Sequence, residues 1–199
     1  QLEEVIVTAQ KREQNLQDVP VAVSTFSEEQ LKNQTIQEFS DIQAQVPGLA
    51  VRTTHHDPSI AQVSIRGQQQ ADLLLTTDSS VGVYVDGVNL PRQAGLNANM
   101  FDIERIEVLK GPQGTLYGRN TTGGAVNVIT NKPDFDGMHG FLEGAFGNEN
   151  FTQLSGAINI PLADTVAARL AVQKTDRDGW GQSRFNGNEL YDQNELFFR

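Results

Sequence analysis

One stretch of the sequence has the glycine spacing of a phosphate-binding loop. The glycines at Gly118 and Gly123 are placed as such a loop requires. The next two positions hold Gly124 and Ala125, where the loop needs Lys and then Ser or Thr. Without the lysine, the loop lacks the charge that contacts the phosphates. The spacing therefore does not predict a nucleotide site.

A second candidate for chemistry is the run of His55, His56 and Asp57. Adjacent side chains on an extended chain point in opposite directions, and no second group of ligands completes a metal site. No spacing of Ser, His and Asp indicates a catalytic triad either. We therefore expect no enzyme activity, no metal and no cofactor.

The composition of the 199 residues argues against further classes of function. The net charge is -10, which disfavours a nucleic-acid partner held through its phosphates. Cysteine is absent, so no disulfide is expected. No apolar run approaches the ~20 residues of a membrane-spanning helix. Any contact with a membrane would therefore be made by β-strands.

The elements that must position functional residues are organised around one β–turn–β unit, with β-prone runs at 103–109 and 125–130. Between these runs the sequence is rich in glycine, which lets two backbones pass closely. In the first run Ile106 alternates with Arg105 and Glu107. This alternation predicts a half-buried strand whose polar face meets water.

Residues 19–48 are predicted to form a strand followed by two short helices. Ser27 with Gln30, and Thr35 with Glu38, have the spacing of a capping box, which would start each helix. Helical spacing indicates that the second helix turns an apolar face to a core. The residues of this face are Ile36, Phe39, Ile42 and Val46.

Further short strands are predicted, and recognisable motifs accompany them. The dipeptide Asp86-Gly87 predicts a two-residue hairpin turn. The motifs VPGL, IRG, VYVDGV and ERIEVLKGPQGTLYG occur in this order, and GGAVNVITNKP follows them. In these motifs the chain resembles the plug domain of the TonB-dependent outer-membrane receptors. The strands are expected at 49–53, 63–66, 81–85 and 88–90.

The resemblance implies the fold class and the division of the chain. We expect an α+β plug domain, a small mixed β-sheet with short helices, followed by the first antiparallel strands of a transmembrane β-barrel. The predicted segments are an N-terminal tail with a TonB box at 1–15, the plug domain at 16–133, and the incomplete barrel at 138–199.

The barrel strands are indicated by strict alternation of apolar and polar residues over about ten residues per strand. A soluble antiparallel sandwich is the alternative, although its strands usually run shorter. The smallest barrels need about 8 strands, so we expect the sequence to be part of a longer protein. The apolar faces contain Leu154, Ile158, Ile160 and Leu162, then Val166, Ala168, Leu170 and Val172, then Leu196 and Phe198.

A short β-prone run near the start of the sequence resembles the TonB box of the family. Its residues alone favour a disordered tail or an edge strand. The resemblance implies that it adds itself as a strand to TonB of the inner-membrane energy-coupling complex, mainly through main-chain hydrogen bonds. The predicted TonB-binding residues are Glu4, Val5, Ile6, Val7, Thr8 and Ala9.

The resemblance also implies two sets of plug residues with functional contacts. Arg66 and Arg105 are expected to pair with carboxylates on barrel strands and so hold the plug in the barrel. The outward apices of the plug are expected to contact the ligand. The predicted apical contacts are Arg52, His55, His56, Gln69, Gln70, Arg92 and Asn97.

The function implied by the resemblance is TonB-energised uptake of a scarce nutrient, most often a ferric siderophore in this family. The partners would be TonB, the lipid of the outer membrane and the small nutrient ligand. The protein would lie in the outer membrane of a Gram-negative bacterium, with its N-terminus in the periplasm. The alternatives are uptake of cobalamin or a carbohydrate, or a soluble β-rich binding or adhesion module.

Overall fold

The computed structural model describes most of the chain and divides it into two compact units, Gln1–Thr130 and Asn131–Arg199. The predicted site residues Glu4, Val5, His55, His56 and Gln70 lie outside the described residues. The described residues are 6–12, 14–36, 38–53, 59–69, 78–92, 95–97, 100–179, 181–182, 184–185 and 189–199.

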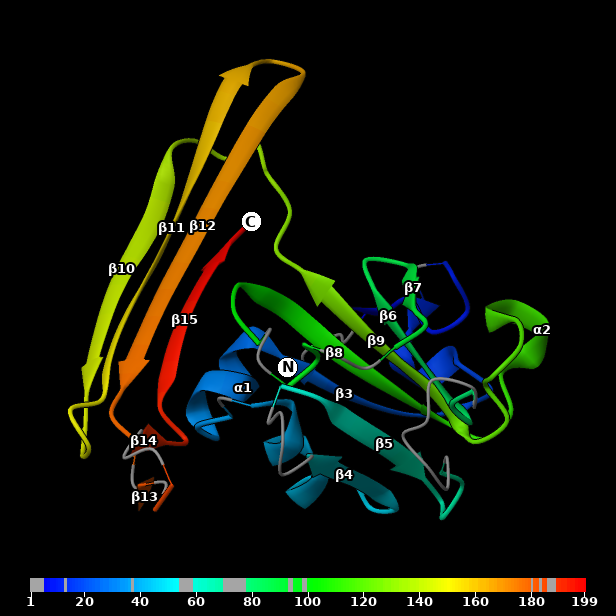
Figure 1. The fold of residues 1–199 in the computed structure, drawn as a ribbon. Helices are drawn as coiled ribbons and strands as arrows, with labels where there is room; N and C mark the ends of the chain where they lie inside the picture. Colours follow the sequence, from blue (N-terminus) through cyan, green and yellow to red (C-terminus); the bar gives the residue numbers. More distant parts are fainter. Residues whose placement is uncertain are drawn as a thin grey trace. The chain divides into compact units, whose positions relative to one another are not determined.

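A five-stranded mixed sheet forms the centre of the N-terminal unit (Figure 1). Its order is β3-β8-β9-β6-β7, and only the pair β6–β9 is parallel. The predicted β–turn–β unit is confirmed as the antiparallel pair β8–β9 at the middle of the sheet. The five strands are β3 (Ala22–Ser27), β6 (Val81–Val85), β7 (Val88–Leu90), β8 (Ile103–Lys110) and β9 (Gly124–Thr130).

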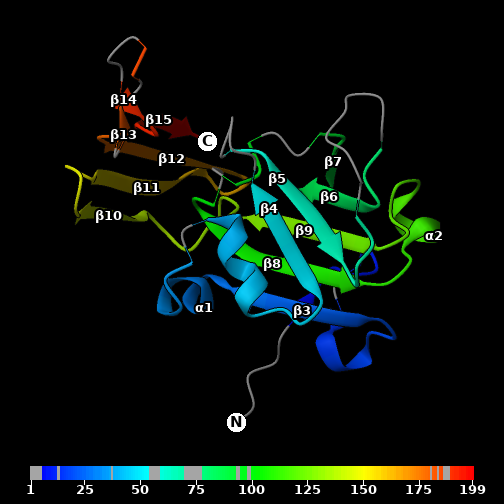
Figure 2. The same ribbon diagram turned by 60° about the horizontal axis from the view of Figure 1, so that its bottom comes forward.

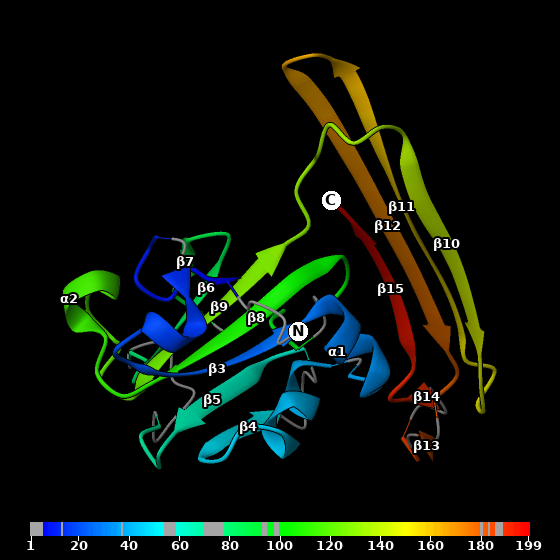
Figure 3. The same ribbon diagram turned by 180° about the vertical axis from the view of Figure 1, so that it is seen from behind.

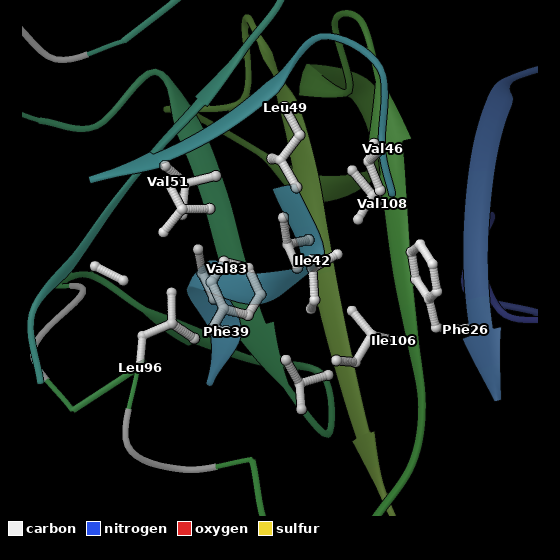
Figure 4. Packing of buried hydrophobic residues seen from close by; sticks show 14 of the residues in the cluster. Phe26, Phe39, Ile42, Val46, Leu49, Val51, Val83, Leu96, Ile106 and Val108 are labelled. Atoms are coloured by element: carbon white, nitrogen blue, oxygen red, sulfur yellow. The ribbon is translucent and has the colours of Figure 1, made fainter. Parts of the chain in front are cut away.

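The main hydrophobic core lies on one face of this sheet. Two helical segments and a separate hairpin cover the face: α1 (Glu28–Asn33), η2 (Phe39–Ala44), β4 (Leu49–Thr53) and β5 (Ala61–Ile65). Figure 2 shows β4, β5 and α1 in front of the sheet. Phe39 and Ile42 of η2 point towards Val83, Ile106 and the neighbouring strands, as Figure 4 shows. The apolar face predicted for the second helix is therefore confirmed.

The two predicted helix starts differ in their outcome. Ser27 and Gln30 form the expected capping box at α1. The second helix, a 3₁₀-helix, instead begins after Glu38, whose N–H donates to the Asp41 carboxylate at 2.9 Å. Thr35 has a φ of 54°. This left-handed conformation is incompatible with the extended backbone of an N-cap, so the prediction that Thr35 caps the helix was wrong.

The hairpin predicted at Asp86-Gly87 joins β6 to β7. Both turn residues have positive φ, 48° and 80°, as a type I′ turn requires. The Asp86 carboxylate accepts hydrogen bonds from the N–H and the hydroxyl of Thr130, both at 2.9 Å. The turn thus holds the last residue of β9.

The opposite face of the sheet is covered by the N-terminal segment. This segment contains β1 (Ile6–Val7), β2 (Gln14–Asn15) and the 3₁₀-helix η1 (Leu16–Asp18), and β1 pairs with β2. Val7 is 0% exposed and Ala9 is 1% exposed, and both pack with Leu109 and Ala125 of the sheet. Figure 3 shows the dark blue segment in front of the sheet. The sequence predicted an N-terminal tail outside the folded core. For the described part of this segment the prediction was wrong, because the segment packs on the sheet.

The C-terminal unit is an open antiparallel sheet of order β10-β11-β12-β15. The register pairs Ile158 with Leu170 and Val172 with Phe198, so these side chains share one face with Leu154. The predicted alternation is thereby confirmed. The strands are β10 (His139–Phe146), β11 (Thr152–Ala163), β12 (Val166–Arg177) and β15 (Gln193–Phe198), beside the short pair β13 (Gly181–Gln182) and β14 (Glu189–Leu190).

The shared apolar face of this sheet is exposed, although its residues are large. Leu170 is 56% exposed and Phe198 is 79% exposed. The other face carries buried small or polar side chains, among them Ser155, Ala157 and Ala171. The exposed face also includes Leu142, Phe146, Leu154, Leu162, Val166, Val172 and Leu196.

In the part of the chain that the structure describes, no helix has the length and apolar character needed to cross a membrane.

Candidate functional site

The N-terminal segment is held on the sheet by a buried carboxylate. Glu107 Oε1 accepts hydrogen bonds from the main-chain N–H of Thr8 at 2.7 Å and from its hydroxyl at 3.1 Å. The Glu107 side chain is 0% exposed. A buried carboxylate needs paired donors, because its loss of hydration is otherwise unfavourable by several kcal/mol. Thr8 supplies two of these donors.

Two neighbours on the sheet complete the surroundings of Glu107. Arg105 donates from Nε to Glu107 Oε1 at 2.9 Å and from Nη2 to the Thr8 hydroxyl at 3.2 Å, and it also pairs with Glu104. Asn127 donates from Nδ2 to Glu107 Oε2 at 3.3 Å. The alternation along β8 brings Arg105 and Glu107 to the same face, as predicted. That face is not wet, because the N-terminal segment covers it, so this part of the prediction was wrong.

Tyr117 holds the next residue of the segment. Its hydroxyl donates to the main-chain carbonyl of Ala9 at 2.9 Å and accepts from Asn127 Nδ2 at 2.8 Å. Burial raises the pKa of Tyr117; the Asn127 hydrogen bond opposes this shift, and the nearby charges of Glu107 and Tyr84 support it. The hydroxyl is therefore protonated at neutral pH and acts as the donor to Ala9.

The position of Tyr117 is itself fixed from two sides. It ends the short helix α2 (Gly114–Tyr117), and its carbonyl accepts a hydrogen bond from the Tyr84 hydroxyl at 2.5 Å. The two rings meet edge to face, with their centroids 5.0 Å apart. Lys11 Nζ lies 5.5 Å from the centroid of the Tyr117 ring, within the range of a cation–π contact. Tyr117 thus contacts Ala9 and Lys11 of the turn that follows β1.

We call Glu107, Tyr117, Asn127 and Arg105 the cradle of the N-terminal segment. Sequence reasoning did not identify Glu107, Tyr117 or Asn127 as contacts of this segment. The available signal was a glutamate on the same strand face as an arginine. Nothing in the sequence indicated which segment covers that face.

The predicted apical residues that are described do not all reach solvent. Arg52 is exposed on β4, opposite Gln62 of β5, while Gln69 and Arg92 are exposed in loops. Asn97 is only 3% exposed. Its Oδ1 accepts from the N–H of Ser40, and its Nδ2 donates to Glu38, both at 2.9 Å. The side chain of Asn97 therefore fastens its turn to η2 and is not a solvent-facing contact.

The two arginines predicted to pair with barrel strands have different surroundings. Arg66 is exposed in a turn with a φ of 53°, and its N–H donates to the carbonyl of Gly48 at 2.7 Å. Its guanidinium lies beside Gly111, 3.4 Å from the position that a Cβ there would occupy. Arg105 instead lies in the cradle. Pairing of either arginine with a barrel carboxylate stays a prediction.

Among the residues that the structure describes, no three His, Cys, Asp or Glu side chains form a group that could hold a metal ion.

Comparison with known families decides the classification. The model described as the TonB-dependent Receptor Plug Domain matches residues 15–125. The chain belongs to this family. The resemblance inferred from the sequence motifs is thereby confirmed. The matched range includes β8 and most of the cradle of the plug, whereas the predicted TonB box lies before it.

The similarity to curated relatives extends beyond the matched plug domain. The iron-regulated outer membrane virulence protein of Vibrio cholerae is 30% identical over 190 residues, which cover 88% of this chain and 28% of that protein. The vitamin B12 transporter BtuB of Vibrio vulnificus is 34% identical over 130 residues, covering 63% of this chain and 20% of the transporter. The chain therefore spans about a quarter of the length of these relatives.

Solved receptor structures share the fold of the chain. The ferric yersiniabactin uptake receptor FyuA from Yersinia pestis aligns with a TM-score of 0.75 and 24% identity, covering 86% of this chain and 26% of the receptor. The siderophore receptor PiuA from Acinetobacter baumannii aligns with a TM-score of 0.71 and 23% identity, covering 92% of this chain and 24% of that receptor.

Proposed function

We propose that the chain is part of an outer-membrane receptor that takes up a ferric siderophore with energy supplied through TonB. The match of residues 15–125 to the plug family is the observation that carries this proposal. The names of the V. cholerae relative and of the ferric yersiniabactin receptor FyuA both refer to iron, which supports a ferric ligand. The proposed location is the outer membrane of a Gram-negative bacterium.

Within this function, residues 4–9 act as the coupling strand. Ligand bound at the plug apices changes how available this segment is, and TonB then pairs with it from the periplasm. The inner-membrane complex of TonB, driven by the proton gradient, pulls on the segment and displaces or partly unfolds the plug. The N-terminus therefore lies in the periplasm, and the ligand undergoes no chemical change.

Transport by the full-length protein provides the direct test. Cells that express it should accumulate ⁵⁵Fe-labelled siderophore, and a proton uncoupler or deletion of TonB should reduce accumulation to the background level. Surface binding at 0 °C should survive both treatments. A full-length protein that stays soluble without detergent would instead support the binding or adhesion module.

The similarity to vitamin B12 transporters supports a second ligand class, the cobalamins. The two classes can be separated by measuring competition between cyanocobalamin and ferric siderophores for surface binding. Stronger expression of the full gene in iron-starved cells would favour the siderophore. If only cyanocobalamin competes, the proposed ligand becomes a cobalamin instead of a siderophore. The proposed coupling to TonB is unaffected by that result.

The C-terminal sheet is proposed to begin the transmembrane barrel, with its exposed apolar face against lipid. Leu170 lies within the apolar part of β12, so Leu170→Arg should destabilise the barrel by about 2–4 kcal/mol near the bilayer midplane. Gln173→Arg, on the opposite face of the same strand, is the matched control and should have a small effect. Unfolding of the full-length protein in lipid vesicles measures both. Equal losses for the two variants would contradict the lipid-facing assignment.

A further prediction concerns the apical contacts. Replacing Arg52, His55 and His56 together by alanine should weaken binding of an anionic ferric siderophore about 10- to 100-fold, since hydrogen bonds to charged groups contribute ~1.5–3 kcal/mol. Lys32→Ala is the control, because it removes an exposed positive charge on α1. Whole-cell binding measures the dissociation constant. Unchanged affinity in the triple variant would place the ligand elsewhere.

A further inference from the structure

The connector, residues 131–138, links β9 to β10 and belongs to the C-terminal unit. One side chain of β11 fastens it to the sheet. Asn159 Oδ1 accepts from the N–H of Asp134 at 3.0 Å. Its Nδ2 donates to the carbonyl oxygens of Asp134 and Gly137, at 3.1 and 3.2 Å, and contacts Asp134 Oδ1 at 3.2 Å. The two hydrogens of the amide are therefore shared among three acceptors, and the connector is held at two positions.

The surroundings of Asn159 strengthen this attachment. Asn159 is 0% exposed, and the register places it opposite His139 at the start of β10. His139 Nδ1 lies 3.2 Å from the carbonyl oxygen of Gly137, and its Nε2 lies 3.3 Å from Asp134 Oδ2. Asp134 Oδ1 also accepts from the N–H of Asp136 at 3.0 Å. A buried amide is unfavourable without partners, so release of the connector would also leave Asn159 unsatisfied.

The plug end of the connector is fastened separately, within the N-terminal unit. Thr130, the last residue of β9, is 5% exposed and donates its N–H and its hydroxyl to the Asp86 carboxylate. The N–H of Asp86 donates to the carbonyl of Val128 at 3.0 Å. Residues 131–133 lie between the two attachments and end in a proline. Proline fixes its own φ and restricts the residue before it, so this stretch is short and stiff.

We propose that Asn159 is a clasp that fixes the length of the connector and limits how far β9 can move from the C-terminal sheet when the plug is displaced. With the clasp closed, the four residue steps from Thr130 to Asp134 reach at most about 14 Å. With the clasp open, the nine steps from Thr130 to His139 reach about 32 Å. This inference rests on the proposed function, because it assumes that the plug is displaced during uptake. It adds the residue that sets the limit of that displacement.

Hydrogen exchange of the connector amides in the full-length receptor tests the clasp. Mass spectrometry can follow exchange in peptides that contain Asp134 and Asp136, whose N–H groups are bonded there. Asn159→Ala should accelerate this exchange about tenfold or more, as expected for the loss of more than one hydrogen bond. Gln153→Ala is the matched control, because Gln153 lies on the same face of β11 but donates to Thr175 of β12. Exchange of the connector in the control should equal that of the parent.

A second pair of substitutions lies in the connector itself and leaves β11 unchanged. Asp134→Ala removes the carboxylate that accepts from Asn159 and from the N–H of Asp136. Exchange at position 136 should accelerate about fivefold. Asp136→Ala is the control, because it removes an exposed carboxylate of the same connector, and it should have no effect after correction for intrinsic exchange rates. Unchanged exchange in both Asn159→Ala and Asp134→Ala, or equal acceleration in variants and controls, would overturn the clasp.

Single-molecule pulling from the N-terminus measures the length of chain that the clasp holds back. With the full-length receptor in a lipid bilayer, the parent should show a rupture event that releases about 18 Å before β10 yields. This is the extended length of the chain from Asp134 to His139. Asn159→Ala should lack the event, and Gln153→Ala should retain it. A parent without the event, or an Asn159→Ala variant that keeps it, would overturn the proposed limit.

These measurements involve neither TonB nor a siderophore, so the clasp and the proposed function can fail separately. If exchange and pulling give the expected results but cells with the parent receptor accumulate no ⁵⁵Fe-labelled siderophore, the clasp stands and the proposed uptake is wrong. If the parent transports the siderophore but Asn159→Ala matches the parent in exchange and pulling, the uptake stands and the clasp is overturned.

Discussion

Replacing Val7 by proline is expected to abolish energy-dependent uptake while the ligand still binds at the cell surface. Proline removes the N–H of residue 7 and fixes its φ near -65°, and both changes oppose strand pairing with TonB. The plug core on the other face of the sheet contains no residue of this segment, so its packing should persist. The measurements are surface binding at 0 °C and uncoupler-sensitive accumulation of ⁵⁵Fe-labelled siderophore in whole cells.

Val7→Ala separates the loss of the main-chain donor from the loss of packing. Alanine keeps the N–H but removes most of a side chain that is fully buried against the sheet. We expect this variant to retain uptake, because its pairing groups are intact. Full uptake by Val7→Pro would show that the segment is not the coupling strand. Simultaneous loss of ligand binding would assign the segment a purely structural role.

Replacing Gly124 by alanine should destabilise the plug by about 3–6 kcal/mol, a large part of the stability of a small domain. A Cβ at this position would lie 2.2 Å from the carbonyl oxygen of Leu109 and 2.9 Å from Ile65 Cδ1. The residue also has a φ of 150°, which side chains other than glycine rarely adopt. Relief of this overlap would separate β9 from β8 at the middle of the sheet.

Limited proteolysis of the full-length receptor can measure this loss, since cleavage follows the population of opened plug. Gly114→Ala is the control. It lies at the start of α2, and its Cβ would meet no atom within 4 Å. The control should resist protease as well as the parent does. Equal resistance in Gly124→Ala would mean that β8 and β9 can make room for the Cβ while their hydrogen bonds persist.

Local patterns in the sequence predicted the elements whose formation depends on neighbouring residues. The alternation along β8 and the residue types at Asp86-Gly87 were sufficient because strand periodicity and turn geometry are properties of a few consecutive positions. The apolar spacing of Phe39 and Ile42 likewise placed the second helix against the core. The same holds for the exposed apolar face of the C-terminal sheet.

Contacts between residues far apart in the chain could not be predicted in this way. Thr8 and Glu107 are 99 positions apart, and neither neighbourhood indicates the other. The family resemblance predicted Asn97 at an outward apex of the plug, but its amide bonds to Glu38 and Ser40, which lie 59 and 57 positions earlier. Polar residues in loops are often exposed, and only the tertiary structure shows which of them bridge two segments.

The place of β3 in the sheet has a mechanical consequence. Among the residues that the structure describes, β3 is the first strand of the sheet in the sequence and also one of its edges, paired with β8 alone. Once the N-terminal segment has left the cradle, a force applied through the N-terminus reaches Ala22 at the start of β3 and has to separate only one ladder of hydrogen bonds. A central strand would require two ladders to separate. Traction should therefore peel β3 away together with Phe26, while the order β8-β9-β6-β7 and its contacts persist.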